Sequence, residues 1–104
     1  MVRVVDVTAQ NIQVRDKRLR IVRLAKVVFG DEFIVSDDVP NLISIRLKGG
    51  RDSIADVSDG STPTVSVYTP SYFHQARCLA EGYEKEVGTE VELKQDYSRE
   101  RQFQ

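Results

Sequence analysis

The sequence predicts an α+β fold, a two-layer sandwich whose mixed or antiparallel sheet carries two helices on one face. Residues 65–96 have the pattern strand, helix, strand, and residues 18–29 have the apolar spacing of another helix. The strand expected at residues 90–94 alternates apolar and charged side chains, so one of its faces lies in water. Helices on both sides would require apolar strands throughout, so we expect both helices on the same side.

Residues 2–7 open the chain with an alternating stretch that is rich in valine. Valine is enriched in strands because its branched side chain packs well on a pleated surface. We therefore expect a strand here, which Ile12 and Val14 could extend beyond a kink.

Residues 18–29 follow with apolar side chains on one side of a helical wheel and basic ones opposite. Asp16 is the expected N-cap of this helix and Gly30 its expected C-terminal stop. A strand is the competing interpretation, because four residues of the stretch are β-branched. The apolar side consists of Ile21, Leu24, Ala25 and Val28.

Two short strands are expected in the middle of the chain. Residues 33–35 are apolar and end at an acidic turn that contains proline, and residues 42–48 alternate like a half-buried strand. Residues 49–64 concentrate glycine, serine, aspartate and proline, so we expect a loop. Within that loop, residues 54–57 form at most a small edge strand or a turn that docks on the core.

The most consistent signals lie in the C-terminal unit. A strand over residues 65–68 leads to Thr69, whose hydroxyl could cap the helix, and to Pro70 at the first helical position. The helix carries a sustained apolar stripe and ends at Gly88. This stripe consists of Tyr72, Phe73, Ala76, Leu79, Ala80, Tyr83 and Val87.

These elements form one domain over residues 1–96, and residues 97–104 are a polar tail that we expect to fray. A chain of 104 residues has room for one small core. The order of strands and helices is close to the ferredoxin-like pattern with an additional strand.

The composition is that of a globular domain. Hydrophobic residues make up 40% of the chain and charged residues 30%, which is too apolar for a disordered protein. The longest apolar run, residues 27–29, is far shorter than the roughly 20 residues of a membrane helix. The single cysteine allows no disulfide within the chain, so we expect a cytoplasmic location, the host cytoplasm for a viral protein.

Positive charge near the N-terminus makes nucleic acid one candidate partner. Arginine can contact a phosphate through two parallel hydrogen bonds, but no aromatic residue lies within the basic segment to stack on a base. A solvated helix face, or a surface that pairs with the acidic half of another subunit, explains the segment as well. The candidate residues are Arg15, Lys17, Arg18, Arg20, Arg23 and Lys26.

His74 and Cys78, the only histidine and the only cysteine, lie four residues apart on the predicted helix, with Glu81 one turn further on. The spacing places imidazole and thiol on one face, opposite the apolar stripe. They could contribute to a zinc site completed by another subunit, or form a thiol site activated by the imidazole. A structural zinc site needs four ligands, so a solvated helix face is the simpler interpretation.

The sequence contains no complete catalytic signature, cofactor loop or metal motif, so we expect neither catalysis nor a cofactor. The leading hypothesis is a small interaction or assembly protein, acting as a homo-oligomer or accessory subunit through exposed strand edges and complementary charge. A nucleic-acid-binding regulator that uses residues 15–26 is the first alternative. A metal or thiol protein centred on His74 and Cys78 is the second.

Two stretches resemble parts of known families. Residues 65–93, VSVYTPSYFHQARCLAEGYEKEVGTEVEL, are similar to the opening strand, helix and strand of the solute-binding proteins of ABC importers, which we interpret as a generic crossover unit. Residues 5–7 and 27–37 resemble the start of the septation-regulator family of small DNA-binding bacterial proteins. That alignment requires residues 18–29 to form a strand.

Overall fold

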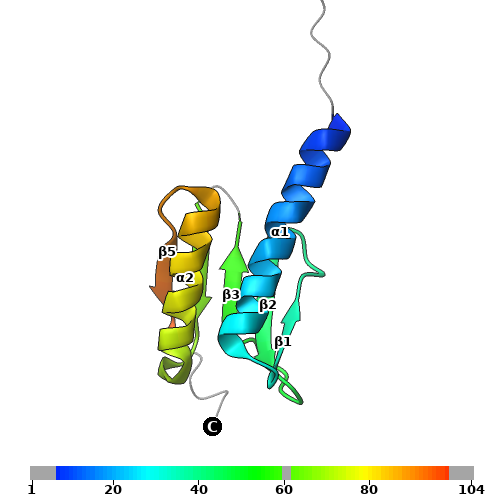
Figure 1. The fold of residues 1–104 in the computed structure, drawn as a ribbon. Helices are drawn as coiled ribbons and strands as arrows, with labels where there is room; N and C mark the ends of the chain where they lie inside the picture. The colour runs from blue at the N-terminus through cyan, green and yellow to red at the C-terminus, as the bar shows by residue number, and fades with distance from the viewer. Residues whose placement is uncertain (1–6, 60–61, 99–104) are drawn as a thin grey trace, which may run out of the picture.

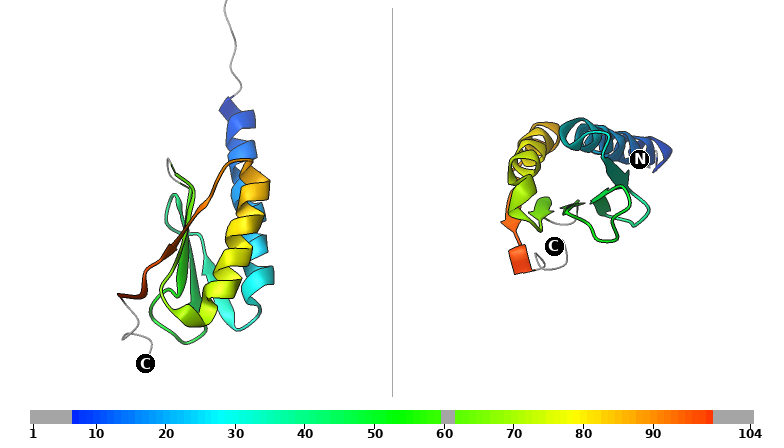
Figure 2. Two further views of the ribbon diagram at one scale, coloured as in Figure 1. Left: turned by 90° about the vertical axis from the view of Figure 1, so that its left-hand side faces the viewer. Right: turned by 90° about the horizontal axis from the view of Figure 1, so that it is seen from below.

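A computed structural model of the chain describes residues 7–59 and 62–98, and shows two helices on one face of a five-stranded sheet (Figure 1). Seen along the sheet, both helices lie on the same side and the other face carries none (Figure 2). The predicted two-layer α+β class is therefore confirmed. The elements are α1 (Val7–Phe29), β1 (Phe33–Ser36), β2 (Leu42–Leu47), β3 (Ala55–Ser58), β4 (Thr64–Val67), the 3₁₀ turn η1 (Pro70–Tyr72), α2 (Phe73–Val87) and β5 (Glu92–Gln95).

The strands lie in the sheet in chain order, β1-β2-β3-β4-β5. Neighbours from β1 to β4 are antiparallel, whereas β4 and β5 are parallel. A parallel pair needs a crossover, and α2 provides it. The ferredoxin-like arrangement is not specifically confirmed, because its first strand was expected at residues 2–7, of which residues 2–6 lie outside the described part.

The N-terminal prediction was wrong where the structure can test it. Val7, Ile12, Val14 and Asp16 all belong to α1, so the first three extend no strand and Asp16 is not an N-cap. β-branched residues are only a few tenths of a kcal/mol less favourable in a helix than most other residues. Tertiary packing easily outweighs so small a difference.

The helical interpretation of residues 18–29 is confirmed over the strand alternative, so the alignment with the septation regulators loses the strand that it requires. Gly30 ends the helix as expected. Its φ of 91° is in the left-handed region that favours glycine, and its N–H donates to the Lys26 carbonyl at 2.9 Å.

The loop expected over residues 49–64 contains a central strand. β3 lies between β2 and β4, and both Ala55 and Val57 are fully buried. Its alternation is real, but alanine, aspartate and serine have low strand propensity, and the flanking turn residues concealed it. Ile54 docks on the core next to this strand and is buried as well.

The start of the C-terminal helix also differs from expectation. Pro70 occupies the first turn as predicted, but the Thr69 side chain makes no capping hydrogen bond. The Thr69 carbonyl instead accepts the Tyr72 N–H at 3.3 Å in the 3₁₀ turn. The end of α2 is as predicted, since Gly88 has a φ of 71° and its N–H donates to the Glu84 carbonyl.

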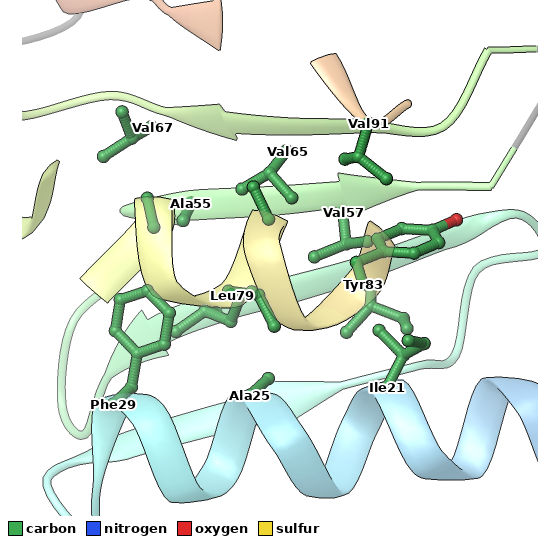
Figure 3. Packing of buried hydrophobic residues seen from close by; sticks show 14 of the residues in the cluster. Ile21, Ala25, Phe29, Ala55, Val57, Val65, Val67, Leu79, Tyr83 and Val91 are labelled. Carbon is green, nitrogen blue, oxygen red and sulfur yellow. The ribbon is translucent and has the colours of Figure 1, made fainter. Parts of the chain in front are cut away.

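The core fills the space between the two helices and the sheet. Ile21, Ala25 and Phe29 of α1 face Leu79 and Tyr83 of α2 (Figure 3). The sheet closes the core with residues buried on its helix side: Ile43, Ile45, Ala55, Val57, Val65 and Val67. Tyr97, which was expected in the frayed tail, packs against this core.

Over their described residues, neither helix is long and apolar enough to cross a membrane.

The two helices approach closely where Gly82 of α2 meets Leu24 of α1. A Cβ built on Gly82 would overlap the Leu24 Cδ2 methyl group. Glycine inside a helix usually costs about 0.5–1 kcal/mol relative to alanine, so this position trades helix propensity for close packing.

We predict that Gly82→Ala lowers the free energy of unfolding by about 1 kcal/mol, because overpacking of about 1–3 kcal/mol exceeds the gain in helix propensity. In a Leu24→Ala background the clash is gone, so the same substitution should stabilise by up to about 1 kcal/mol. Urea unfolding of the four proteins measures both effects. An equal effect of Gly82→Ala in the two backgrounds would contradict the packing argument.

Candidate functional site

The predicted metal or thiol site lies on the outer face of α2. His74, Cys78 and Glu81 are all exposed, as their helical spacing implied. Glu81 pairs with Arg77 at 3.2 Å, and the His74 ring meets only the edge of Phe73 in the ring contacts of the described residues. Among the side chains that the structure describes, no group of three or more potential ligands is placed to hold a metal ion. These residues therefore present a solvated helix surface.

The predicted basic segment does not form one binding face. Arg20 Nε donates to Glu86 of α2 at 2.8 Å, so its charge serves to join the helices. Lys17, Arg23 and Lys26 are exposed, but nine residues at 100° each place Lys17 and Lys26 on opposite sides of α1. Arg15 belongs to α1, with a side chain outside the described set.

Arg18 acts inside the fold. Its Nη2 lies 2.7–2.9 Å from the carbonyl oxygens of Asp37, Val39 and Leu42, and its Nη1 lies 3.9 Å from an Asp59 carboxylate oxygen. A guanidinium Nη2 has two hydrogens, so three acceptors share them. The side chain is 19% exposed. Sequence reasoning placed Arg18 among phosphate contacts, whereas the fold uses it to tie α1 to the connection between β1 and β2.

A pocket of about 220 Å³ opens beside Arg18, between both helices and the sheet. Apolar side chains of Ile21, Ile43 and Val57 line it together with the ring of Tyr83. Its volume is below the roughly 300–1,000 Å³ of typical small-molecule sites. Burial raises the pKa of Tyr83, and the Asp59 carboxylate raises it further. The phenol therefore stays neutral to higher pH than a free tyrosine, and its ring contributes to the core.

The open face of the sheet is mainly polar along its middle row. Asp56 lies at its centre, where one carboxylate oxygen accepts the Tyr68 hydroxyl at 2.5 Å. A face of this kind offers little apolar area to a docking partner. The residues paired across it in register are Ser36, Ser44, Asp56, Ser66 and Lys94.

The two edges of the sheet differ in chemistry. β5 exposes charged side chains, Glu92 and Lys94, which hinder the addition of another strand. β1, with the sequence FIVS, has no charged residue or proline, and all four of its residues are partly exposed. Open apolar edges are ready templates for strand addition. β1 is thus the part of the described surface best suited to bind another chain.

The backbone groups of β1 follow the alternation of antiparallel pairing. The Lys48 N–H donates to the Glu32 carbonyl at 3.0 Å, so the paired positions continue at Ile34 and Ser36. The N–H and C=O of Val35 and the C=O of Phe33 therefore point away from β2. These groups are available to an added strand.

The sequence contained this edge but gave no means of recognising it. Acidic residues flank the apolar strand on both sides, Asp31 and Glu32 before it and Asp37 and Asp38 after it, but acidic turns also flank central strands. Whether such a strand is central or at an edge depends on which strands pair, and that is a property of the tertiary fold.

Similarity to known proteins provides no family for this chain. Comparisons with protein-family models, with curated proteins and with solved structures return no match. On the described surface, the β1 edge is the feature best suited to binding.

We predict that Arg18→Ala lowers the free energy of unfolding by about 2 kcal/mol, because three carbonyl oxygens lose a charged donor. Arg18→Lys should recover only part of this loss, since an ammonium lacks the planar fork. Arg23→Ala, on the exposed side of the same helix, is the matched control and should change stability by less than about 0.5 kcal/mol. Urea unfolding measures all three, and equal losses for Arg18→Ala and Arg23→Ala would refute the role of Arg18.

We also predict that Tyr83 makes the protein sensitive to alkali. An unfolded tyrosine loses its proton near pH 10, whereas Tyr83 retains it to higher pH. The stability it contributes is fully present below about pH 10 and is lost as the pH rises through the folded pKa. The free energy of unfolding, measured at pH 8 and pH 11, should therefore fall less in Tyr83→Phe than in the wild type. Parallel losses in the two proteins would show that Tyr83 is not the group responsible.

Proposed function

We propose that the protein is a small interaction protein, an assembly or accessory subunit, that binds its partner by adding a strand at the β1 edge. The observation that carries this proposal is the contrast between the edges, since β5 presents Glu92 and Lys94 and β1 presents an uncharged apolar strand. Strand addition uses backbone hydrogen bonds for affinity and side-chain contacts for specificity. It requires no catalytic group and no cofactor.

The surroundings of β1 provide apolar contacts for such a strand. Leu19 is 45% exposed and Val39 54% exposed, both unusual for large hydrophobic residues on this surface. Leu19 lies on the flank of α1 that faces away from α2, because the other flank carries Arg20, which pairs with Glu86. Val39 follows the end of β1 closely in the chain. An added strand would therefore find apolar side chains near the end of β1.

The nucleic-acid alternative has less support from the geometry. Two of its six candidate residues, Arg18 and Arg20, already bind groups of the same chain. The exposed Lys17 and Lys26 lie on opposite sides of α1 and cannot follow one phosphate backbone together. We therefore propose that the partner is a protein. The single cysteine suits a reducing, cytosolic compartment.

The substitution Val35→Pro tests the proposal. Proline removes the outward N–H of Val35 and leaves the bonds of β1 to β2 intact, because those involve Ile34 and Ser36. We expect the affinity for a partner, or for a second copy, to fall at least about tenfold. A tenfold fall corresponds to a loss of roughly 1.4 kcal/mol of binding free energy. Light scattering over micromolar concentrations and recovery of bound proteins are the measurements.

The matched control is Gln95→Pro on β5. The Asp96 N–H donates to the Val67 carbonyl and the Glu92 N–H to the Pro63 carbonyl, so the N–H of Gln95 points away from the sheet like that of Val35. This variant should bind like the wild type. Equal binding by both proline variants, with both folded by circular dichroism, would rule out strand addition at β1.

A further inference from the structure

We infer that the strand added at β1 comes from a different protein and is an extended apolar segment with lysine or arginine at both ends. This inference rests on the proposed strand addition and specifies its occupant. Four acidic residues flank β1 closely, Asp31 and Glu32 before it and Asp37 and Asp38 after it. A short apolar strand between two acidic ends selects a partner of opposite charge at those ends.

The four carboxylates have no partner among the side chains that the structure describes. All four residues are exposed. Among the side chains of residues 17–59 and 62–98, no ion pair or side-chain hydrogen bond engages Asp31, Glu32, Asp37 or Asp38. The bond between Arg18 and Asp37 uses the backbone carbonyl of Asp37, so the carboxylate itself is untouched.

Pairing of β1 with β1 of a second copy would bring like charges together. An antiparallel pair joins outward-pointing residues, so the two-fold axis passes through Ile34 or Val35. Centring on Ile34 brings Asp31, in the turn before β1, towards Asp37 of the other copy. Centring on Val35 sets Glu32 opposite Asp38. Symmetry repeats each contact, and like charges directly opposite one another destabilise a strand pair.

The acidic ends thus have a double effect. They oppose self-association of an edge that is otherwise suited to it, as charged residues beside apolar strands generally do. They also favour a heterologous segment whose basic residues meet them. The exposed cations Lys26 and Lys48 form no ion pair with these carboxylates among the described side chains. The Arg18 guanidinium lies near the end of β1, but it faces backbone carbonyls and the Asp59 carboxylate.

Synthetic nonapeptides provide the test, with affinities measured by isothermal titration calorimetry at low salt. The probes are KKTVTVTKK, its acidic counterpart EETVTVTEE, and KKTVPVTKK, in which proline blocks strand pairing. We expect the first peptide to bind at least about tenfold more tightly than either of the others, with an advantage that shrinks as salt screens the charges. Val35→Pro should abolish its binding, and Gln95→Pro should not.

The charge contribution is isolated by the variant Asp31→Asn/Glu32→Gln/Asp37→Asn/Asp38→Asn. Its preference for the basic over the acidic peptide should fall to less than about threefold. The matched control, Glu90→Gln/Glu92→Gln, removes acidic groups beside β5 and should keep the preference. Light scattering should also show more self-association in the fourfold variant than in the wild type, because the repulsion between copies is gone.

The outcomes distinguish failure of strand addition at β1 from failure of the basic partner segment. If basic and acidic peptides bind the wild type equally and Val35→Pro abolishes both, strand addition stands and the basic partner is refuted. A wild-type dimer that Val35→Pro dissociates likewise supports strand addition and refutes a different protein as the occupant. If no peptide binds and Val35→Pro changes neither mass nor partner recovery, both proposals fail.

Discussion

Arg18 provides the interaction on which the arrangement of this domain most depends. One guanidinium group reaches from α1 to three carbonyl oxygens in the connection between β1 and β2, and lies close to Asp59 after β3. Without this donor the three backbone carbonyls would lose their bonds together, and the loss is most costly at the partly buried Leu42 carbonyl. The contact holds α1 over the end of β1 and so defines the edge that the sheet presents. It also removes Arg18 from any role in binding phosphate.

An open sheet must manage two edges, and this protein treats them differently. β5 has charged side chains within the strand, and these oppose the addition of another strand. β1 has no charged residue within the strand, and its acidic neighbours lie beyond its two ends. Charges at the ends oppose pairing with a copy that carries the same charges, but they do not oppose every added strand. This distinction connects the structure of the edge to the choice of partner, and it explains why an exposed apolar strand does not by itself imply a homo-oligomer.

Local chemistry predicted those elements whose own residues specify them. The stripe of α2 and the left-handed glycines at 30 and 88 were predicted correctly, because periodicity and a positive φ are encoded within a few residues. β3 was predicted only as a possible small edge strand over residues 54–57, because alanine and aspartate have weak strand propensity, whereas it lies buried between two neighbours. The start of α1 was missed for the opposite reason, since Val7, Ile12 and Val14 have high strand propensity but lie in the helix.

The sequence by itself determined the two-layer class, the helix side of the sheet and the exposure of His74, Cys78 and Glu81, because each depends on spacing within one element. Only the tertiary structure decided the order of the strands, and with it which strand lies at the edge. It alone turned Arg18 from a candidate phosphate contact into a structural tie. Both decisions depend on contacts between residues far apart in the chain, and such contacts leave no periodic signal in the sequence.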